Sequence, residues 1–208
     1  MVRRAHIASL DARSDTTECR ANVPANSAMD RYAQGDDAAF SELYDALAPR
    51  LYGYLVRQTR NDSRAEDLLQ QTFLQVHCAR GRFIRGADVV PWVFAIARRL
   101  LIDGVRRSGR EVSLELREET GAPPPISTAL QQDELVHSKQ LAASIERELA
   151  RLPDSHREAF ELIKQEGLSL AEAAEVLGTT VAAVKLRAHR TYQALREALG
   201  PAFERSAK

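Results

Sequence analysis

The residues with the clearest chemical potential lie near the C-terminus, where four basic side chains follow a tight glycine turn. They are Lys185, Arg187, Arg190 and Arg196. Only Glu197 opposes them, so this short segment carries three net positive charges when His189 is neutral. Guanidinium and ammonium groups bind phosphate oxygens, and arginine also forms paired hydrogen bonds with guanine in the major groove. The set predicts a DNA-binding surface.

Two short helices are expected to position these charges. Ser169, with Glu172 three residues on, has the pattern of a capping box, in which each side chain caps the backbone N–H of the other. Gly178 ends this first helix, and a second helix begins at Thr180 and stops before Gly200. Two helices joined by a short glycine turn predict a helix-turn-helix, whose second helix enters the major groove.

The overall composition makes the local charge more informative. The 208 residues include 29 Lys and Arg against 29 Asp and Glu, so attraction to phosphate must come from concentrated patches. Hydrophobic residues are 44% of the chain and aromatic residues only 6%, which favours small helical domains. Cys19 and Cys78 lie far apart and neither is part of a C-x-x-C motif, so we expect no disulfide framework, no metal site and a reducing cytoplasm. No apolar run approaches the ~18–20 residues of a membrane span, so no membrane insertion is expected.

Enzyme signatures are absent from the sequence. We find no phosphate-binding glycine loop, no dinucleotide fingerprint, no H-E-x-x-H and no G-x-S-x-G. The five histidines are scattered, and no nucleophile, base and oxyanion constellation emerges. We therefore expect a protein that is not an enzyme and that needs no cofactor.

The pattern along the chain predicts an all-α fold with two helical domains joined by a flexible linker, the C-terminal one containing the helix-turn-helix. Residues 1–34 lack periodicity and are expected to be a disordered lead. The first domain spans residues 35–108, the linker 109–130, the second domain 131–200, and a tail 201–208. The linker is acidic and contains three consecutive prolines, which suits either a solvated spacer or a strand that occupies a basic channel on a partner.

Capping residues and prolines suggest where the individual helices begin. Asp36 or Asp37 is expected to cap the first helix, and Asp154 or Ser155 the helix before the helix-turn-helix. The expected first residues of the second and fourth helices are Pro49 and Pro91, and a capping box of Ser63 with Glu66 would start the third. Buried stripes follow at helical spacing: Phe40, Leu43, Tyr44 and Leu47; Leu51, Tyr52 and Leu55; Leu69, Thr72, Phe73 and Val76; Val93, Ile96, Ala97 and Leu100. Trp92 is expected to pack at a helix start, and Cys78 to be a buried thiol.

Two stretches resemble known parts of one family. Residues 64–76, Arg82-Phe83 and residues 91–103 are similar to domain two of the extracytoplasmic-function (ECF) sigma factors, and the segment from Leu152 through the helix-turn-helix is similar to their domain four. The resemblance implies a protein that binds core RNA polymerase and directs it to promoter DNA. Domain two would open and read the minus-ten element, and domain four would read the minus-thirty-five element as duplex. It also implies an anti-sigma factor as a regulatory partner.

The resemblance assigns roles to particular residues. Four on the outer side of one helix would bind polymerase: Glu66, Asp67, Gln70 and Gln71. For the minus-ten element, a loop would capture a flipped base and a basic helix would follow the phosphates: Arg85, Gly86, Ala87, Asp88, Arg98, Arg99, Arg106 and Arg107. Arg99 departs from the asparagine that many members carry at this position. The minus-thirty-five element would be bound by Arg157, Lys185, Leu186, Arg187, His189 and Arg190, while Val181, Val184, Ala188 and Leu195 pack inward.

The residues themselves leave other interpretations open. The polar face at residues 66–71 is also what a merely solvated helix would show. A free-standing helix-turn-helix regulator, or a helical protein–protein adaptor, would explain part of the chain. The regulator leaves the basic helix at residues 91–107 and its adjacent loop unexplained, and the adaptor leaves the basic groove helix unexplained.

Overall fold

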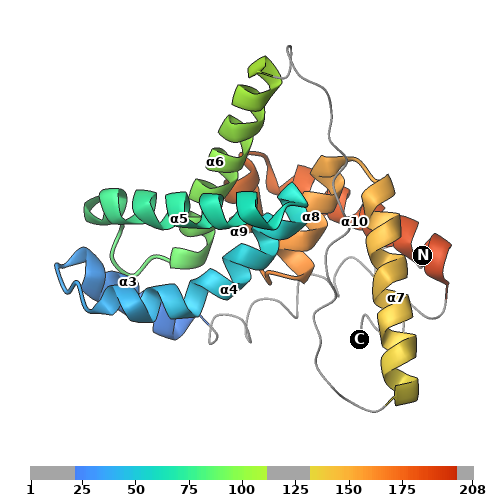
Figure 1. The fold of residues 1–208 in the computed structure, drawn as a ribbon, viewed down its shortest axis with the longest axis horizontal. Coiled ribbons are helices and arrows are strands. Elements are labelled where there is room, and N and C mark those ends of the chain that lie inside the picture. The colour runs from blue at the N-terminus through green and yellow to red at the C-terminus, as the bar shows by residue number, and fades with distance from the viewer. Residues whose placement is uncertain (1–21, 112–131, 201–208) are drawn as a thin grey trace. The chain divides into compact units, whose positions relative to one another are not determined.

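The computed structural model describes residues 22–111 and 132–200 of the chain, and side chains within 22–104 and 142–200. Every regular element in these ranges is helical, which confirms the predicted all-α class (Figure 1). The helices are α3 (Val23–Ala33), α4 (Ala39–Thr59), α5 (Asp62–Ala79), the short 3-10 helix η1 (Arg80–Arg82), α6 (Val89–Glu111), α7 (Gln132–Arg151), α8 (Asp154–Lys164), α9 (Leu170–Leu177) and α10 (Val181–Leu199). The predictions for most of the N-terminal lead, for the acidic linker and for the tail fall outside the described residues.

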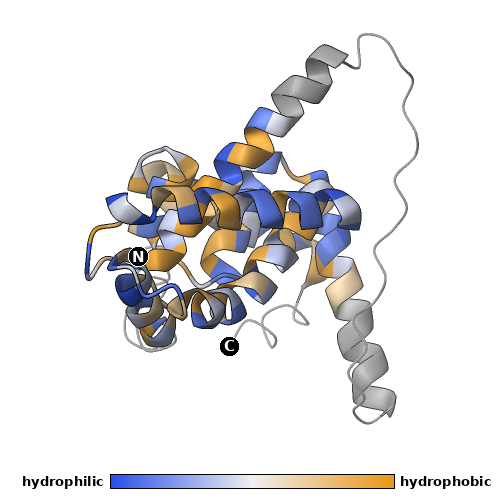
Figure 2. Ribbon diagram, turned by 60° about the vertical axis from the view of Figure 1, so that its left-hand side comes forward, coloured by the Kyte–Doolittle hydropathy of each residue, from blue (hydrophilic) through white to orange (hydrophobic). Residues whose placement is uncertain are grey.

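The chain forms two compact units, and the first contains α3, α4, α5, η1 and α6. Within it α4 packs against α3 and α5, and α6 packs on both α4 and α5. Leucines four residues apart on α4, from Leu43 to Leu55, are fully buried, as the stripe predicted. Leu69, Phe73 and Val76 of α5, the helix that packs against α4, are buried as well. Figure 2 shows hydrophobic and hydrophilic residues on different sides of these helices.

Two details of the first unit differ from the prediction. A single helix, α4, replaces the two predicted helices, with Pro49 inside it. Proline removes one helical hydrogen bond, but Pro49 is exposed, and burial of Leu47 and Leu51 on either side holds the helix together. Tyr44, expected inside, is exposed at the edge of the core, where its ring lies 4.7 Å from that of Phe73.

The helix starts in this unit are also displaced from the predicted caps. Helix α4 begins at Ala39 without a side-chain cap from the preceding aspartates. Helix α5 begins at Asp62, because Asn61 Oδ1 accepts a hydrogen bond from the Arg64 N–H at 2.9 Å and replaces the predicted Ser63 cap. Helix α6 begins before Pro91 and continues to Glu111, three residues past the predicted end of the domain, because one glycine near a helix end is a small cost.

Helix α3 corrects the prediction that residues 1–34 are a disordered lead. Ala25, Ala28, Met29 and Tyr32 are buried. Their spacing of three and four residues puts them on one face of the helix, which packs against α4. The prediction failed because only two of these residues are large, so the stripe is weak in the sequence although its burial is complete.

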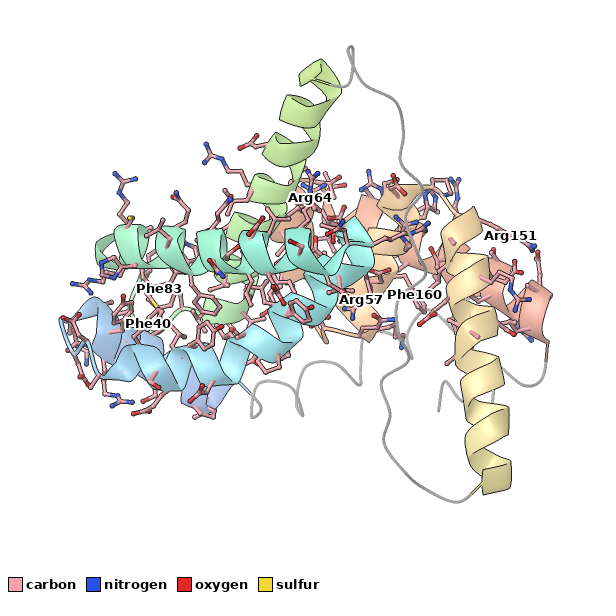
Figure 3. The ribbon with its side chains drawn as sticks, viewed as in Figure 1. Phe40, Arg57, Arg64, Phe83, Arg151 and Phe160 are labelled. Carbon is pink, nitrogen blue, oxygen red and sulfur yellow. The ribbon has the colours of Figure 1, made fainter. Side chains whose placement is uncertain are left out.

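The second unit contains α7, α8, α10 and most of α9. Leu149, Phe160 and Leu195 form the buried cluster that joins α7, α8 and α10, and Ile145, Leu152, Tyr192 and Leu199 pack around it. Figure 3 labels Phe160 on α8. Helix α8 begins at Asp154 after Pro153, without the predicted side-chain cap. The buried Thr191 hydroxyl donates to the His156 carbonyl at 3.1 Å and so ties α10 to the start of α8.

The helix-turn-helix itself forms as the sequence predicts. The Ser169 N–H donates to Glu172 Oε2 at 2.7 Å, and the Glu172 N–H donates to Ser169 Oγ at 3.2 Å, which is the reciprocal capping box. Gly178 takes a φ of 60°, and Thr180 Oγ1 accepts from the Ala183 N–H at 3.2 Å. Val184 and Leu195 are buried as predicted, and Ala188 is half-buried. Val181 is exposed instead, because a first helical residue has no preceding turn for its side chain to cover.

The burial of α3 gives a test of its place in the fold. Met29→Ala removes a fully buried side chain between α3 and α4 and should lower the free energy of unfolding by about 2–5 kcal/mol. Ser27→Ala, on the exposed side of the same helix, should change it by less than about 0.5 kcal/mol. Urea unfolding of the full chain measures both, and equal stability of the two variants would contradict the packing described here.

Candidate nucleic-acid interface

The N-terminal end of the loop between η1 and α6 is held in place by two sets of contacts. Phe83, labelled in Figure 3, packs its ring 5.2 Å from that of Trp92, at the start of α6. Just before the loop, the Arg80 guanidinium of η1 lies 4.9 Å above the Tyr32 ring and 2.7 Å from Asp37 Oδ1. The hydrogen bond with Tyr32, and after it the Asp37 carboxylate, raise the pKa of Arg80. The start of the loop is therefore anchored on α6, on α3 and on the turn after α3.

The middle of this loop is bonded to polar side chains of α3. The Gly86 N–H donates to Asp30 Oδ1 at 3.0 Å, and the Val89 N–H donates to Asn26 Oδ1 at 2.9 Å. Gly86 has a φ of 77°, a conformation that favours glycine at this turn. None of these contacts was foreseen, because the prediction assigned Asn26 and Asp30 to a disordered lead.

Asp88 has a structural role at the start of α6. Its Oδ1 accepts from the Val90 N–H at 3.0 Å, which caps the start of α6. Its Oδ2 accepts from Asn22 Nδ2 at 3.3 Å. The structure thus gives Asp88 a capping role in addition to the base contact predicted for it.

The exposed part of the loop is short. Arg85 and Gly86 are exposed and Ala87 is half-buried. Ile84, which the sequence analysis did not select, is 76% exposed and directly precedes them. Single exposed apolar residues are common on protein surfaces, but the position of Ile84 beside the exposed Arg85 and Gly86 makes its side chain available for contact with a base or ribose. Its exposure is a property of the folded loop that no sequence pattern signals.

Helix α6 carries the basic residues predicted to follow phosphates. Arg98 is half-buried, and Arg99 is exposed with Nε 3.9 Å from Asp103 Oδ2 one turn on. Arg106 and Arg107 belong to the same helix, but their side chains lie outside the described part of the chain. The helix places the described arginines on successive positions, about 100° apart around its axis.

The outer face of α5 matches its prediction in orientation. Glu66, Asp67, Gln70 and Gln71 are all exposed, opposite the buried face. Leu74 continues this face by one turn and is 59% exposed. Partial burial raises the pKa of Tyr52 on α4, and the charges of Asp62 and Glu66 raise it further. Cys78 is exposed on α5, contrary to the prediction of a buried thiol.

Helix α10 presents a mixed polar and apolar surface directly after the turn. Arg190 is exposed and Leu186 is 50% exposed, while Lys185, Arg187 and His189 are half-buried. Arg157 of α8 differs from them. Its side chain is only 12% exposed and pairs with Asp154 at 2.7 Å and with the buried Glu161 at 3.9 Å. Its ion pairs hold it within the second unit, so its predicted DNA contact would have to compete with these carboxylates.

Two further observations concern metal binding and membranes. Within the ranges that the structure describes, no three His, Cys, Asp or Glu side chains come together as a possible metal site. None of the helices described combines the length and apolar composition that crossing a bilayer requires.

Comparison with known proteins assigns both units to one family. The model of Sigma-70 region 2 matches residues 43–111, and that of Sigma-70 region 4 matches residues 142–195. The sigma factor CarQ of Myxococcus xanthus is 38% identical over 172 residues, which are 83% of this chain and 95% of CarQ. The ECF sigma factor SigF of Caulobacter vibrioides is 33% identical over 175 residues, covering 81% of this chain and 90% of SigF.

A solved structure agrees with these sequence relationships. The sigma factor RpoE of Bartonella quintana, in complex with the anti-sigma factor NepR, superposes with a TM-score of 0.65 at 25% identity and covers 78% of this chain and 97% of that one. The region 2 match lies on the unit with the loop and the basic helix, and the region 4 match on the unit with the helix-turn-helix. The chain therefore belongs to the extracytoplasmic-function sigma factors, and it binds core RNA polymerase and directs it to promoter DNA to initiate transcription.

Proposed function

We propose that the two units divide promoter recognition between them. The first, extended by α3 to begin near Val23 and not at residue 35, takes the minus-ten element, and the second, over residues 131–200, takes the minus-thirty-five element. The observation that carries this assignment is that each unit has exposed residues of its predicted DNA-binding set, such as Arg85 and Arg190, on a loop or helix attached to a buried core. The chain itself performs no catalysis in this scheme, and it works in the cytoplasm, where polymerase and promoter DNA are found.

In vitro transcription is the direct test of this proposal. The full chain is added to core polymerase with a library of promoters randomised at both elements. Selected promoters should share two short conserved elements. Conservation at only one element would contradict the proposal that each unit recognises one element, and it would leave the assignment of the chain to the family unchanged.

Within the second unit, α10 is proposed to lie in the major groove. Arg190 is exposed on this helix, and arginine paired with guanine O6 and N7 is the commonest base-specific contact. Leu186 beside it offers an apolar surface to a thymine methyl group. Lys185, Arg187 and His189 are proposed to support the contact at the groove edges.

Arg190→Ala should relax the preference at one position of the minus-thirty-five element at a cost of about 1–3 kcal/mol. Arg196→Ala is the matched control, because it removes the same charge six residues further along α10. It should weaken all promoters alike. The sequence profiles of transcripts from the randomised library measure the difference, and indistinguishable profiles would refute the assignment of Arg190.

The outer face of α5 is proposed to bind core polymerase. Glu66, Asp67, Gln70 and Gln71 supply its polar contacts, and Leu74 supplies an apolar centre. Interfaces of this kind take most of their energy from a few side chains that lose all contact with water on binding. Leu74 is a large exposed apolar side chain on this face, and removing it from water on binding would contribute through the hydrophobic effect.

Leu74→Ala should weaken binding of the full chain to core polymerase by about 5- to 30-fold, equivalent to ~1–2 kcal/mol. Val23→Ala is the matched control, since Val23 is similarly exposed at 58% but lies on α3. Both variants should unfold at the wild-type temperature, because neither side chain is buried. Fluorescence titration with core enzyme measures the affinity, and equal affinities for the two variants would remove Leu74 from the interface.

An anti-sigma factor is proposed as the second protein partner. The RpoE protein of Bartonella quintana was solved with its anti-sigma factor NepR, and this chain shares its fold and its sequence at 25% identity. The exposed face of α5 is the surface such a regulator would need to cover to exclude polymerase.

For the minus-ten element, the loop from Ile84 to Asp88 is proposed to capture an extruded base. Exposed Ile84 and Arg85 would contact the base, and the basic residues of α6 would follow the phosphates of the opened strand: Arg98, Arg99, Arg106 and Arg107. Gly86 and Ala87 allow close approach of the backbone at the turn.

A further inference from the structure

We propose that Asn26 and Asp30 of α3 are positioning residues, which hold the loop at residues 84–88 in the conformation that captures a minus-ten base. They touch the loop backbone and not the DNA. The inference rests on the role proposed above for that loop.

The sequence spacing of the contacts supports this role. Asn22, Asn26 and Asp30 are four residues apart and so lie along one side of α3. Asp30 Oδ1 accepts from the Gly86 N–H, Asn22 Nδ2 donates to Asp88, and Asn26 Oδ1 accepts from the Val89 N–H. One helix face thus meets three points that run along the loop into the start of α6.

The helix that carries these side chains is itself fixed. The neighbouring face of α3 buries Met29 and Tyr32 in the core. Asn22 Oδ1 also accepts from Arg50 NH1 of α4 at 3.0 Å, which orients the Asn22 amide toward Asp88. The position of Asn26 and Asp30 is therefore set by apolar packing and does not depend on the loop.

The loop has little else to order its centre. In the described structure, the Ala87 N–H bonds to the Ile84 carbonyl at 3.0 Å, and Gly86 permits the turn without restricting it. A glycine-containing loop without the two side-chain acceptors would sample more conformations and lose that freedom on binding a base. An ordered loop binds more tightly because this cost is already met in folding.

The chemistry of these contacts separates a positioning role of Asn26 and Asp30 from a role in general stability. Both Asn26 and Asp30 act as acceptors through one side-chain oxygen. Asp30→Asn and Asn26→Asp keep an oxygen at that place, whereas alanine removes it. The conservative variants should therefore restore a function that depends on these hydrogen bonds.

The experiment uses the full chain in complex with core polymerase and a promoter library randomised only at the minus-ten element. Asn26→Ala and Asp30→Ala should each lower the preference for the selected base about five- to tenfold, the usual effect of losing one hydrogen bond. Asp30→Asn and Asn26→Asp should recover most of it. Ser27→Ala, exposed on the same helix, should leave the preference unchanged. Affinity for core polymerase and minus-thirty-five preference should be those of the wild type in all five variants.

Two outcomes would overturn the inference. One is an equal decrease in transcription from every library member, which leaves the base preference unchanged and would indicate a structural role alone. The other is failure of the conservative variants to restore preference when their melting temperatures are normal. Ile84→Ala and Arg85→Ala separate the inference from the proposal beneath it: if they change the base preference and the α3 variants do not, only the inference fails. If Asn26→Ala, Asp30→Ala, Ile84→Ala and Arg85→Ala all leave the preference unchanged, the proposed role of the loop fails as well.

Discussion

The architecture of the first unit of this sigma factor depends on the burial of one face of α3 against α4. Met29 and Tyr32 are removed from solvent there, and Leu43 and Leu47 of α4 are buried in the same core. Once α3 is fixed by this apolar contact, its remaining faces acquire defined neighbours. Tyr32 lies under the guanidinium of Arg80, and its hydroxyl bonds to His77 Nδ1 on α5. A helix with two large buried side chains thereby fixes the ends of α5 and η1 as well as the loop that follows.

The second unit solves a different physical problem with local means. The first helix of the helix-turn-helix, α9, has only eight residues. The first four backbone N–H groups of any helix have no partner within the helix, so in α9 they are a large fraction of all its N–H groups. The capping box of Ser169 and Glu172 and the cap at Thr180 satisfy such groups at both helix starts. Thr191 links α10 to α8 through a backbone carbonyl, and this buried bond sets the helix that carries Lys185 and Arg190 relative to the core. Local capping, the buried cluster around Leu195 and the hydrogen bond of Thr191 together define the orientation of the basic surface.

This contrast explains which features the sequence could predict. The capping box, the glycine at the turn and the buried faces of α5 and α10 depend on residues close together in the chain, and they were predicted correctly apart from Val181 at the first position of α10. Some errors were local, since the predicted caps at Asp36 or Asp37, at Ser63 and at Asp154 or Ser155 do not form. The larger errors concern features decided by distant contacts. Pro49 did not divide α4 because leucines on both sides of it are buried in the core. Residues 23–33 form a helix because one of their faces packs against α4, and the sequence did not show this because only two residues of that face are large and apolar. The same holds for the site: spacing indicated which residues of α5 face outward, but Asp88 as a cap and Ile84 as an exposed apolar residue depend on how the loop folds.

The loop at residues 84–88 shows how a short connection can combine rigidity with access. Its buried side is occupied by backbone N–H groups and the Asp88 carboxylate, which are satisfied by α3 and by the first turn of α6. Its exposed side is left with Ile84, Arg85 and the backbone of Gly86. An extruded base loses its stacking and pairing energy, so a protein that binds one gains from a surface that does not have to reorganise. Placing the polar groups that maintain the loop on a separate helix leaves the exposed residues available to differ between promoter specificities, because Ile84 and Arg85 take no part in the hydrogen bonds from α3 that hold the loop.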